Sequence, residues 1–405
     1  MSITVEFDNR KRGGVNMTHR ERVSIVLNHK EPDRIPLDLG GRVSTMVDKS
    51  YFNLKNELDL NPVSYEFVDE EWATVEEFDE RILQRFDIDF RYVFLKGAEG
   101  NKKNVRSDGT WVDEMGFLRK KVGYYEEMLY HPLRDAKTID DIKSFKFPDA
   151  YDPHRVEGLK ERAEYLYNST DYAIVGAPVE GGLLEHGFWF RGYENFCTDL
   201  MLNKSWVHVL IRKFTDFYLG LLDMFLSAAG QYMQMIELSD DCATQTSSMI
   251  SPKLYKEIIL PYYIEVTEFI RSKTKAKIFY HSDGSLIEMA PLLIEAGVEV
   301  LNSLQPRSYM MDTTYLKDTY KDKLSFHGGV DIQQVMPFGT TTDVEKEAKR
   351  RIAIYAPGGG YIFACSNIIQ PDTPPINIIT LYDSAKKWGK YPLSEDLMKI
   401  RENIR

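Results

Sequence analysis

The chain has 405 residues, of which 43% are hydrophobic and 28% charged, a composition typical of a globular protein with a large buried core. Its formal net charge of -11 argues against nucleic acid and anionic membranes as main partners, because both require a basic face. The first residues are charged where a signal peptide would be apolar, no apolar run approaches the roughly 18 residues of a membrane span, and the three cysteines lie far apart. We therefore expect a cytoplasmic protein with reduced thiols, and these properties are compatible with a homodimer.

Helix-start signals appear from the first structured segment onward. Residues 1–16 are polar and lack periodicity, so we expect a flexible leader before a single domain over 17–405. The first helix is predicted to begin at a capping box from Thr18 to Glu21. Further helix starts are predicted at Ser251-Pro252 and at a second capping box from Thr342 to Glu345.

Short apolar runs rich in β-branched and aromatic residues recur along the chain, each followed by a helix-like stretch. The eight runs are 35–39, 88–95, 173–177, 232–238, 276–280, 298–304, 324–326 and 361–364. Buried parallel strands read as nearly continuous apolar segments, and eight of them alternating with helices are what a (β/α)8 barrel requires. The predicted fold class is therefore α/β, as a (β/α)8 TIM barrel.

The regular spacing breaks between Lys96 and Pro153. The turn sequence Ser107-Asp108-Gly109 and the alternating residues around Trp111 and Val122 indicate a hairpin inserted after the second strand. Loops that follow barrel strands lie at the mouth of the barrel, so we expect this insertion to lie over the active site.

Polar side chains follow most of the predicted strands, and the carboxyl ends of barrel strands converge on one cavity. The candidates for catalysis are Glu237, Asp240 and Arg42, and those for binding a cofactor or substrate are Arg91, Asn302, Gln305 and His327. The same mouth is predicted to hold Asp38, Glu180, Asp241, Asp331 and Asn367.

The strongest local signal is His281-Ser282-Asp283, directly after an apolar strand. Residues two apart in an extended segment face the same side, so both side chains could reach one ion or one substrate group. The alternative is structural, with Asp283 capping the next helix and His281 bonding a backbone carbonyl. Cys365, at the end of the last strand, could complete a zinc site with these two or pack in the core.

Several other candidates also have a structural explanation. Of Glu237 and the pair Asp240-Asp241, one is expected to line the cavity and another to cap a helix. His327 precedes Gly328-Gly329, so it binds substrate or marks a tight turn. The aromatic segment 187–193 favours packing over a cofactor site.

Five dispersed motifs, taken together and in order, resemble the uroporphyrinogen decarboxylase superfamily. They are Thr18 to Val23 continuing to Glu31-Pro32-Asp33-Arg34-Ile35-Pro36, Ser251-Pro252 to Tyr263, His281 to Gly284, Gly328 to Asp331, and Pro371 to Asn377. The superfamily also includes corrinoid-dependent methyltransferases. The resemblance covers nearly everything from Thr18 to Pro392, and it implies a (β/α)8 barrel with a cleft at its mouth.

The resemblance to the decarboxylases is incomplete at the residues that recognise a tetrapyrrole. Those enzymes carry an arginine pair after the first strand, an aspartate after the second and a histidine just before the final Pro-Asp-Thr-Pro motif. This chain offers the single Arg42, Asp89 followed by Arg91, and Asn367 in the place of the histidine. Porphyrinogen decarboxylation is therefore disfavoured.

The methyltransferase branch is similar to this chain in another way. Its members, such as the methylcobalamin:coenzyme M methyltransferases, hold zinc with a His-x-Cys pair and a cysteine on the last strand. Here His281 matches, Asp283 replaces the first cysteine, and Cys365 lies about two residues before the expected place, which Asn367 occupies. An oxygen-richer zinc site is a harder one, suited to an oxygen-bound methyl group.

The leading hypothesis is a methyltransferase that moves a methyl group between a small substrate and the cobalt of a separate corrinoid protein. Zinc would be held by His281, Asp283 and Cys365 or Asn367, with Glu237 a further candidate. The alternative is a metal-free decarboxylase of a polycarboxylate or tetrapyrrole. A third reading is a tetrapyrrole carrier without chemistry.

Overall fold

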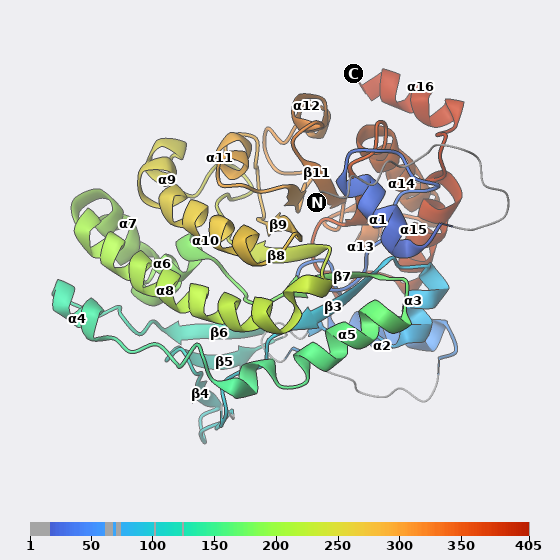
Figure 1. The fold of residues 1–405 in the computed structure, drawn as a ribbon. Helices are drawn as coiled ribbons and strands as arrows, with labels where there is room; N and C mark the ends of the chain where they lie inside the picture. The colour runs from blue at the N-terminus through green and yellow to red at the C-terminus, as the bar shows by residue number, and fades with distance from the viewer. Residues whose placement is uncertain (1–16, 61–67, 70–73, 101–102, 124, 405) are drawn as a thin grey trace, which may run out of the picture.

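The computed structural model describes residues 17–60, 68–69, 74–100, 103–123 and 125–404, so the predicted leader lies outside the described residues. No helix within these ranges is both long and apolar enough to cross a membrane. The architecture is a curled parallel sheet surrounded by helices, with a small antiparallel sheet attached (Figure 1).

The parallel sheet has seven strands in the described chain, and they coincide with seven of the eight predicted apolar runs. Its order is β12-β11-β10-β9-β8-β7-β3, so neighbours in space are also successive along the chain. The strands are β3 Phe90–Phe94, β7 Ala173–Ala177, β8 Met235–Ser239, β9 Lys277–His281, β10 Val300–Asn302, β11 Ser325–Val330 and β12 Tyr361–Cys365.

The predicted first strand, 35–39, forms only isolated pairings. Leu37 pairs in parallel with Phe363 of β12, and its carbonyl accepts from the backbone N–H of Asp89, directly before β3. The N–H of Leu37 donates to the Asp89 carboxylate, at 2.7 Å, instead of to a strand carbonyl. The segment therefore contacts both edges of the sheet, but a closed eight-stranded barrel is not confirmed.

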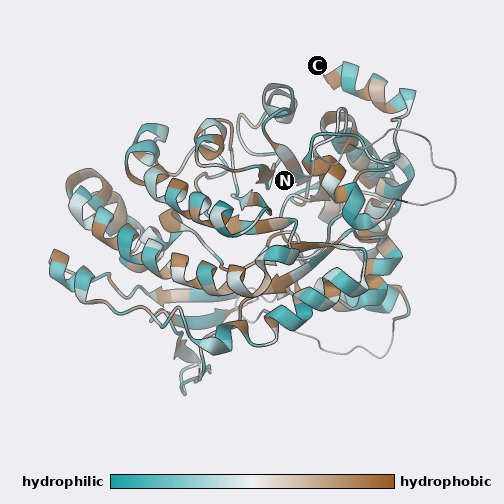
Figure 2. Ribbon diagram, in the orientation of Figure 1, coloured by the Kyte–Doolittle hydropathy of each residue, from teal (hydrophilic) through white to brown (hydrophobic). Residues whose placement is uncertain are grey.

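Helices fill the connections and turn their apolar sides toward the sheet (Figure 2). The helices up to β9 are α1 His19–Leu27, α2 Asp48–Glu57, α3 Glu80–Phe86, α4 Ile139–Ser144, α5 Leu159–Ser169, α6 Leu183–Arg191, α7 Tyr193–Leu202, α8 Lys204–Ala229, α9 Pro252–Ile258 and α10 Leu260–Lys273. Those after it are α11 Ala290–Glu295, α12 Thr313–Tyr320, α13 Val335–Phe338, α14 Thr341–Tyr355, α15 Pro375–Trp388 and α16 Glu395–Ile404. Short 3-10 turns occupy Pro153–Val156 and Gly230–Tyr232.

The helix-start predictions are confirmed at two places and wrong at one. Thr18 and Glu21 form the predicted capping box of α1, and Ser251 caps α9 ahead of Pro252. The N-cap of α14 is Thr340, whose side chain accepts from the N–H of Asp343, and not the predicted Thr342. The spacing fits at either threonine, and the chain is already helical by Thr341.

The predicted insertion is present and larger than a hairpin. It forms the antiparallel sheet β4-β5-β6, with strands Thr110–Val112, Leu118–Val122 and Tyr125–Tyr130. A further short pair joins β1 Val68–Asp69 to β2 Thr74–Val75.

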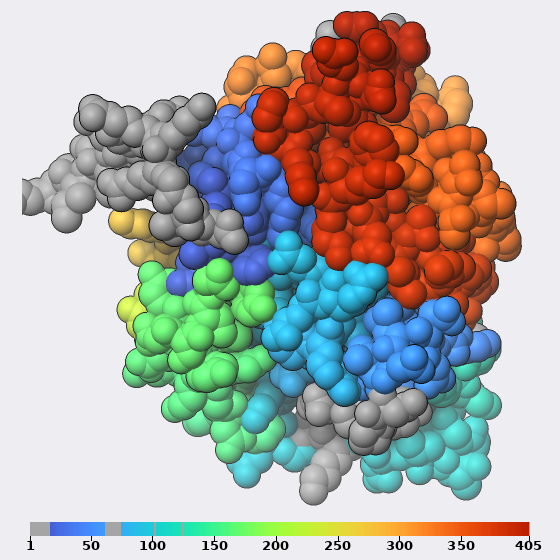
Figure 3. Space-filling model, turned by 90° about the vertical axis from the view of Figure 1, so that its right-hand side faces the viewer, coloured from blue at the N-terminus to red at the C-terminus, as the bar shows by residue number. Residues whose placement is uncertain are grey.

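The amino end of the sheet is closed by helix α1, and this leaves the carboxyl end for the site. Val23 and Val26 of α1 pack against an apolar layer to which the strands contribute. The inward side chains of this layer are Phe90, Val175, Met235, Phe279, Val300 and Ile362. On the outside, α15 packs against α2 and α3, so segments from the N-terminal and C-terminal parts of the chain lie side by side (Figure 3).

Candidate functional site

A cavity of about 170 Å³ opens at the carboxyl ends of β7, β8, β9 and β12. We call it the His281 chamber. Its lining residues among those described are Arg42, Val43, Glu180, Gly181, Glu185, Trp189, Ser239, Asp241, His281, Asp283, Asn367 and Ile368. Most of these follow the strand ends directly, as the sequence predicts for the mouth of such a fold.

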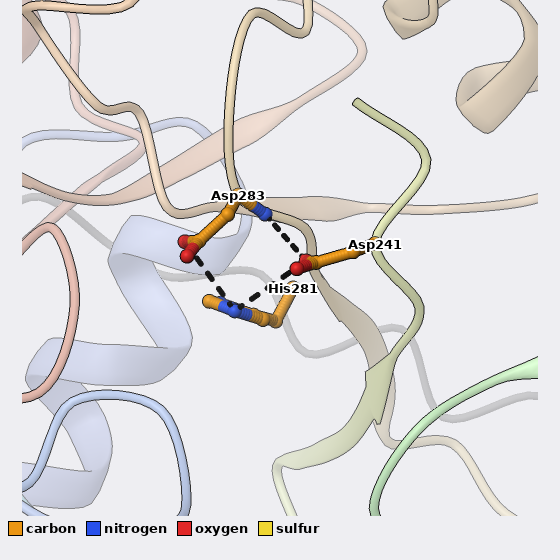
Figure 4. A group of neighbouring side chains, drawn as sticks. All are labelled: Asp241, His281 and Asp283. Atoms are coloured by element: carbon orange, nitrogen blue, oxygen red, sulfur yellow. Dashed lines mark hydrogen bonds and ion pairs between the residues drawn. The ribbon is translucent and has the colours of Figure 1, made fainter. Parts of the chain in front are cut away.

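Three side chains at this chamber converge on one point (Figure 4). One ligand atom from each of Asp241, His281 and Asp283 lies within 4.8 Å of the others. Nε2 of His281 is 3.6 Å from Oδ1 of Asp283 and 4.0 Å from Oδ1 of Asp241. The backbone N–H of Asp283 also donates to Oδ1 of Asp241, at 2.7 Å. Nitrogen and carboxylate oxygen thus face a common space.

The strand register explains why these residues meet. Ser239 of β8 pairs with His281 of β9, and one period-two step beyond this pair lie Asp241 and Asp283. The predicted pairing of His281 with Asp283 on one side of the chain is therefore confirmed. Asp283 does not cap the next helix, since the N-cap of α11 is Met289.

The amide of Asn302 fixes the proton on the His281 ring. Nδ2 of Asn302 lies 3.2 Å from the backbone carbonyl of His327, and that oxygen can only accept, so the amide nitrogen must face it. Oδ1 of Asn302 then faces Nδ1 of His281, and Nδ1 must donate. Nε2 is left to face the two carboxylates, with a lone pair in the neutral ring.

The hydrogen-bond chain continues behind His281 into the buried interior. Nδ2 of Asn302 also donates to Nδ1 of His327, at 2.9 Å. His327 therefore donates through Nε2 to Oδ2 of Asp38, at 2.8 Å, and the hydroxyl of Tyr92 donates to the same oxygen. Asn302, His327 and Asp38 are fully buried, so this chain holds His281 rigidly.

Asn367 holds one oxygen of the Asp283 carboxylate, and the other oxygen faces His281. Burial raises the pKa of the Asp283 carboxyl to about 6, with the nearby Asp241 adding to the rise and His281 opposing it. Asn367 donates to Oδ2 at 2.6 Å, whereas Oδ1 is buried without a hydrogen-bond partner in the described structure. A buried oxygen that lacks a donor is what a missing cation or proton would satisfy.

The donor set fits a zinc ion. Zinc accepts histidine nitrogen and aspartate oxygen, and catalytic sites use three protein ligands with one open position. Bonds of roughly 2.0–2.2 Å in tetrahedral geometry put ligand atoms roughly 3.4 Å apart. The observed separations of 3.6 and 4.0 Å need only small side-chain movements. Asn302 behind His281 is the kind of hydrogen-bond partner that orients a ligating imidazole.

Cys365 is not part of this group of ligand atoms, and Asp241 takes the place predicted for it. The Cys365 side chain is 1% exposed at the end of β12, and burial raises the pKa of its thiol to about 12. A thiol in that environment stays protonated and inert. Asn367, two residues further on, is the residue of this strand end that reaches the chamber.

Arg42 lies at the chamber as predicted, and Glu237 lies below it. The Arg42 guanidinium pairs with Glu76 at 2.8 Å and with Glu180 at 2.7 Å. Glu237 is 2% exposed, its Oε2 has no hydrogen-bond partner within the described residues, and burial raises its pKa to about 8. Burial thus favours the neutral form of Glu237, and the catalytic roles predicted for it and for Arg42 stay predictions.

Asp240 is engaged as a helix cap. Its carboxylate accepts from the backbone N–H groups of Leu184 and Glu185 in the first turn of α6, at 2.9 and 2.8 Å, and from the hydroxyl of Tyr263. The side chain is fully buried and does not line the chamber. Of the two neighbouring aspartates, Asp241 therefore faces the cavity and Asp240 does not.

None of the four predicted binding residues lines the chamber, and two of them, Arg91 and Gln305, have no contact with the cluster in the described structure. Arg91 is the second residue of β3, and its guanidinium turns to the amino end, donating to the carbonyls of Ile88 and Phe90 and stacking 3.5 Å above the ring of Tyr172. Gln305 accepts from the N–H of Gly284 and holds the loop below the chamber. Asn302 and His327 do not line the chamber either, but Asn302 contacts His281 from behind and His327 supports Asn302.

Sequence reasoning missed Asp241 as a ligand candidate and Asn302 as the partner of His281. A signal for Asp241 was present, because counting in steps of two from Glu237 along β8 leads through Ser239 to Asp241. No local signal exists for Asn302, whose contact with His281 depends on the pairing of β9 with β10.

Comparison with known proteins places this geometry in context. Residues 131–388 match the sequence model of the family described as Uroporphyrinogen decarboxylase (URO-D), a range that includes β7 to β12 and all three members of the cluster. The uroporphyrinogen decarboxylase of Legionella pneumophila strain Corby is 20% identical over 264 residues, which cover 63% of this chain and 69% of that protein. The counterpart from strain Lens has the same identity and coverage.

Among solved structures, a methyltransferase from Methanosarcina mazei superposes with a TM-score of 0.61. The superposition covers 92% of this chain and 99% of the other, at 14% sequence identity. At that identity the likeness concerns the fold.

Proposed function

The chain belongs to the uroporphyrinogen decarboxylase family, and from this premise we propose that it is a methyltransferase acting on a small substrate with an oxygen-bound methyl group. One observation carries the proposal: Nε2 of His281 faces the carboxylates of Asp241 and Asp283. Asn302 holds the orientation of the His281 ring by its hydrogen bond to Nδ1. The fold likeness to a methyltransferase supports the same reaction class.

The residues at the chamber have separate tasks in this proposal. Asp241, His281 and Asp283 hold zinc, and bound zinc would supply Lewis acidity to the substrate oxygen. Asn302 accepts the Nδ1 proton of His281, which leaves the lone pair of Nε2 free to bind the metal. Asn367 orients the carboxylate of Asp283. The Arg42–Glu180 pair borders the entrance and positions the substrate.

The methyl group itself moves between the substrate oxygen and cobalt. Cobalt(I) would supply the electron pair of the new carbon–cobalt bond, and the substrate oxygen would keep the pair of the broken carbon–oxygen bond and take up a proton from water. We propose that a separate corrinoid protein brings the cobalt to the carboxyl ends of the strands. The chamber opens there, and Arg42, Glu180 and Trp189 at its wall also line a second cavity that the insertion borders.

Decarboxylation is the second candidate, and the names of the curated relatives favour it. The charges at the site oppose it. The chamber is lined by the carboxyl groups of Asp241, Asp283, Glu180 and Glu185 and by one guanidinium, that of Arg42, which already pairs with Glu76 and Glu180. A polycarboxylate would have to displace these pairs, so the lining disfavours it. Arg91 and Asp89, the other residues such a reaction would use, lie at the amino end of β3.

Metal content and methyl transfer test the proposal. The purified protein should bind one zinc per chain, and Asp241→Ala and His281→Ala should each weaken binding at least about 100-fold. Cys365→Ala is the matched control and should leave zinc affinity unchanged. The zinc-loaded protein should form methylcobalamin from cob(I)alamin and a methyl ether. Undiminished transfer by the His281→Ala protein, or zinc loss in Cys365→Ala, would contradict the site.

A further inference from the structure

A second cavity, of about 270 Å³, lies beside the His281 chamber, and we call it the insert chamber. It is enclosed by the β4–β5 region of the insertion, the ends of β3 and β7, and helices α6 and α8. Arg42, Glu180 and Trp189 line both cavities. A molecule that fills the insert chamber can therefore extend one end toward His281.

Aromatic side chains from the insertion and from two helices form one part of the insert chamber wall, and seven charged residues line the rest together with small and aliphatic residues. Phe117 comes from the insertion, Trp189 from α6, and Phe214 and Phe217 from α8. His186 stacks on Phe214 with ring centroids 3.9 Å apart, and the centroid of Trp189 is 4.7 Å from that of His186. Packed ring faces at a cavity of this size favour a flat ligand with one aromatic ring.

Six of the seven charged residues at the insert chamber pair with one another, and the seventh, Lys96, pairs with Glu157 outside the cavity at 3.3 Å. Arg155 contacts Glu114 at 3.1 Å, Arg119 contacts Asp113, and Arg42 contacts Glu180 at 2.7 Å. A charged ligand would have to compete with these pairs and lose its own hydration. The lining therefore favours an uncharged ligand.

His186 supplies a neutral hydrogen-bond acceptor at the chamber. Its Nδ1 lies 2.8 Å from the carbonyl oxygen of Gly182, which can only accept, so Nδ1 donates. Burial lowers the pKa of His186 to about 3, so the ring is neutral and Nε2 carries a lone pair. In the described part of the chain no donor bonds to this Nε2, which suits a ligand hydroxyl.

We propose that the insert chamber binds the ring of an aromatic methyl ether that carries a free hydroxyl. The ring lies among Trp189, Phe214 and Phe217, the hydroxyl donates to Nε2 of His186, and the methoxy group points past Trp189 toward His281. This orientation rests on the proposed function, whereas the binding of the ring does not. The insertion then acts as a specificity element, since Phe117 and Met115 come from it.

Calorimetry on metal-free protein, with 2-methoxyphenol, methoxybenzene and benzoate as probes, tests the binding. We expect 2-methoxyphenol to bind roughly threefold to tenfold more tightly than methoxybenzene, since one hydrogen bond differs, and benzoate to bind weakest. His186→Phe keeps the stacked ring and removes the acceptor, so it should abolish the preference for the hydroxyl. Equal affinities for both neutral probes in the wild type, or a preference for benzoate, would overturn the proposal.

Tryptophan fluorescence locates the bound ring. Quenching by 2-methoxyphenol should disappear in Trp189→Phe, which keeps an aromatic wall, and persist in the control Trp206→Phe, which lies outside the chamber. Val179→Phe narrows the chamber without deleting a packed ring and should weaken binding about tenfold. Quenching that survives in Trp189→Phe would place the ligand elsewhere.

These measurements separate the two proposals. If the aromatic probes bind but the protein takes up no zinc, the proposed methyl transfer fails and the aromatic site stands. If zinc binds and the probes do not, the aromatic site fails and the metal cluster stands.

Discussion

Asn302 accepts a hydrogen bond from Nδ1 of His281 and at the same time donates to the backbone carbonyl of His327. The two contacts together leave one arrangement of the amide and one proton position on the imidazole. The position of the proton on the His281 ring, at the end of β9, is thus set by Asn302 at the end of β10, the neighbouring strand in the sheet.

Replacement of Asn302 by leucine should weaken zinc binding by about 10–100-fold, because partners behind a ligating histidine contribute on that scale. The buried Asn377, which donates to the carbonyls of Met336 and Gly339, provides the control. Asn377→Leu should lower stability and leave zinc affinity intact. Competition with a chromogenic chelator measures both variants. Equal zinc affinity in a folded Asn302→Leu protein would remove Asn302 from the site.

The strands could be predicted from the sequence because buried parallel strands are apolar along their whole length. The segment 35–39 contains Pro36, which has no N–H for a strand ladder, and the Asp89 carboxylate captures the N–H of Leu37, so only isolated pairings form. The proline is a signal in the sequence, whereas the competing Asp89 lies about 50 positions away and cannot be found from local composition.

Site residues on one strand could be predicted from the sequence, whereas those whose position depends on the pairing of two strands could not. His281 and Asp283 share a side of one chain segment, and period-two counting finds them. The choice between Asp240 and Asp241 depends on the register of β8 against β9 and on α6, whose N–H groups occupy Asp240. The place of Cys365 depends on where β12 ends, and family spacing does not determine that point.

Glu237 should make the protein less stable as the pH rises. Its folded pKa of about 8 lies above the ordinary value of 4.5, so between these values the folded state holds a proton that the unfolded state has lost. Stability from this group falls by up to about 1.4 kcal/mol per pH unit in that window. Glu237→Gln cannot lose a proton, so its stability relative to wild type should rise between pH 5 and pH 8.

Urea unfolding at several pH values measures this difference, with Glu268→Gln at an exposed position as the control. Between pH 5 and pH 8, the free energy of unfolding of Glu237→Gln should rise by about 2–4 kcal/mol relative to wild type. The difference between the control and wild type should stay constant over the same range. A Glu237→Gln curve parallel to wild type would mean that the carboxyl is ionised in the folded protein.

The cap of α14 provides a local test of the structure. Thr340→Ala removes the side-chain acceptor for the N–H of Asp343 and should cost about 1 kcal/mol in the free energy of unfolding. Thr342→Ala lies inside the first turn and should change stability by less than about 0.5 kcal/mol. Denaturation midpoints of the two variants measure the difference. A larger loss of stability in Thr342→Ala than in Thr340→Ala would show that Thr342 is the N-cap, as the sequence alone predicts.

Asp89 should be structural and not catalytic. Its buried carboxylate accepts from Arg22 at 2.6 Å, from Arg34 at 2.7 Å and from the N–H of Leu37, all at the amino end of β3. Asp89→Asn removes the negative charge that balances two buried guanidinium groups, so it should lower the free energy of unfolding by about 3–5 kcal/mol. Asp87→Asn is the control, because Asp87 also pairs with Arg34 but is 46% exposed, and it should cost less than about 1 kcal/mol.

Chemical denaturation and zinc affinity, measured on the same Asp89→Asn protein, separate the two roles. A structural Asp89 predicts a large loss of stability with zinc affinity retained in the folded fraction, since His281 lies at the opposite end of the strands. A decarboxylase that used Asp89 on its substrate would lose turnover at nearly unchanged stability. Equal small losses in Asp89→Asn and Asp87→Asn would show that the buried carboxylate does not hold the arginines, and the amino end of the sheet would then need another explanation for its closure.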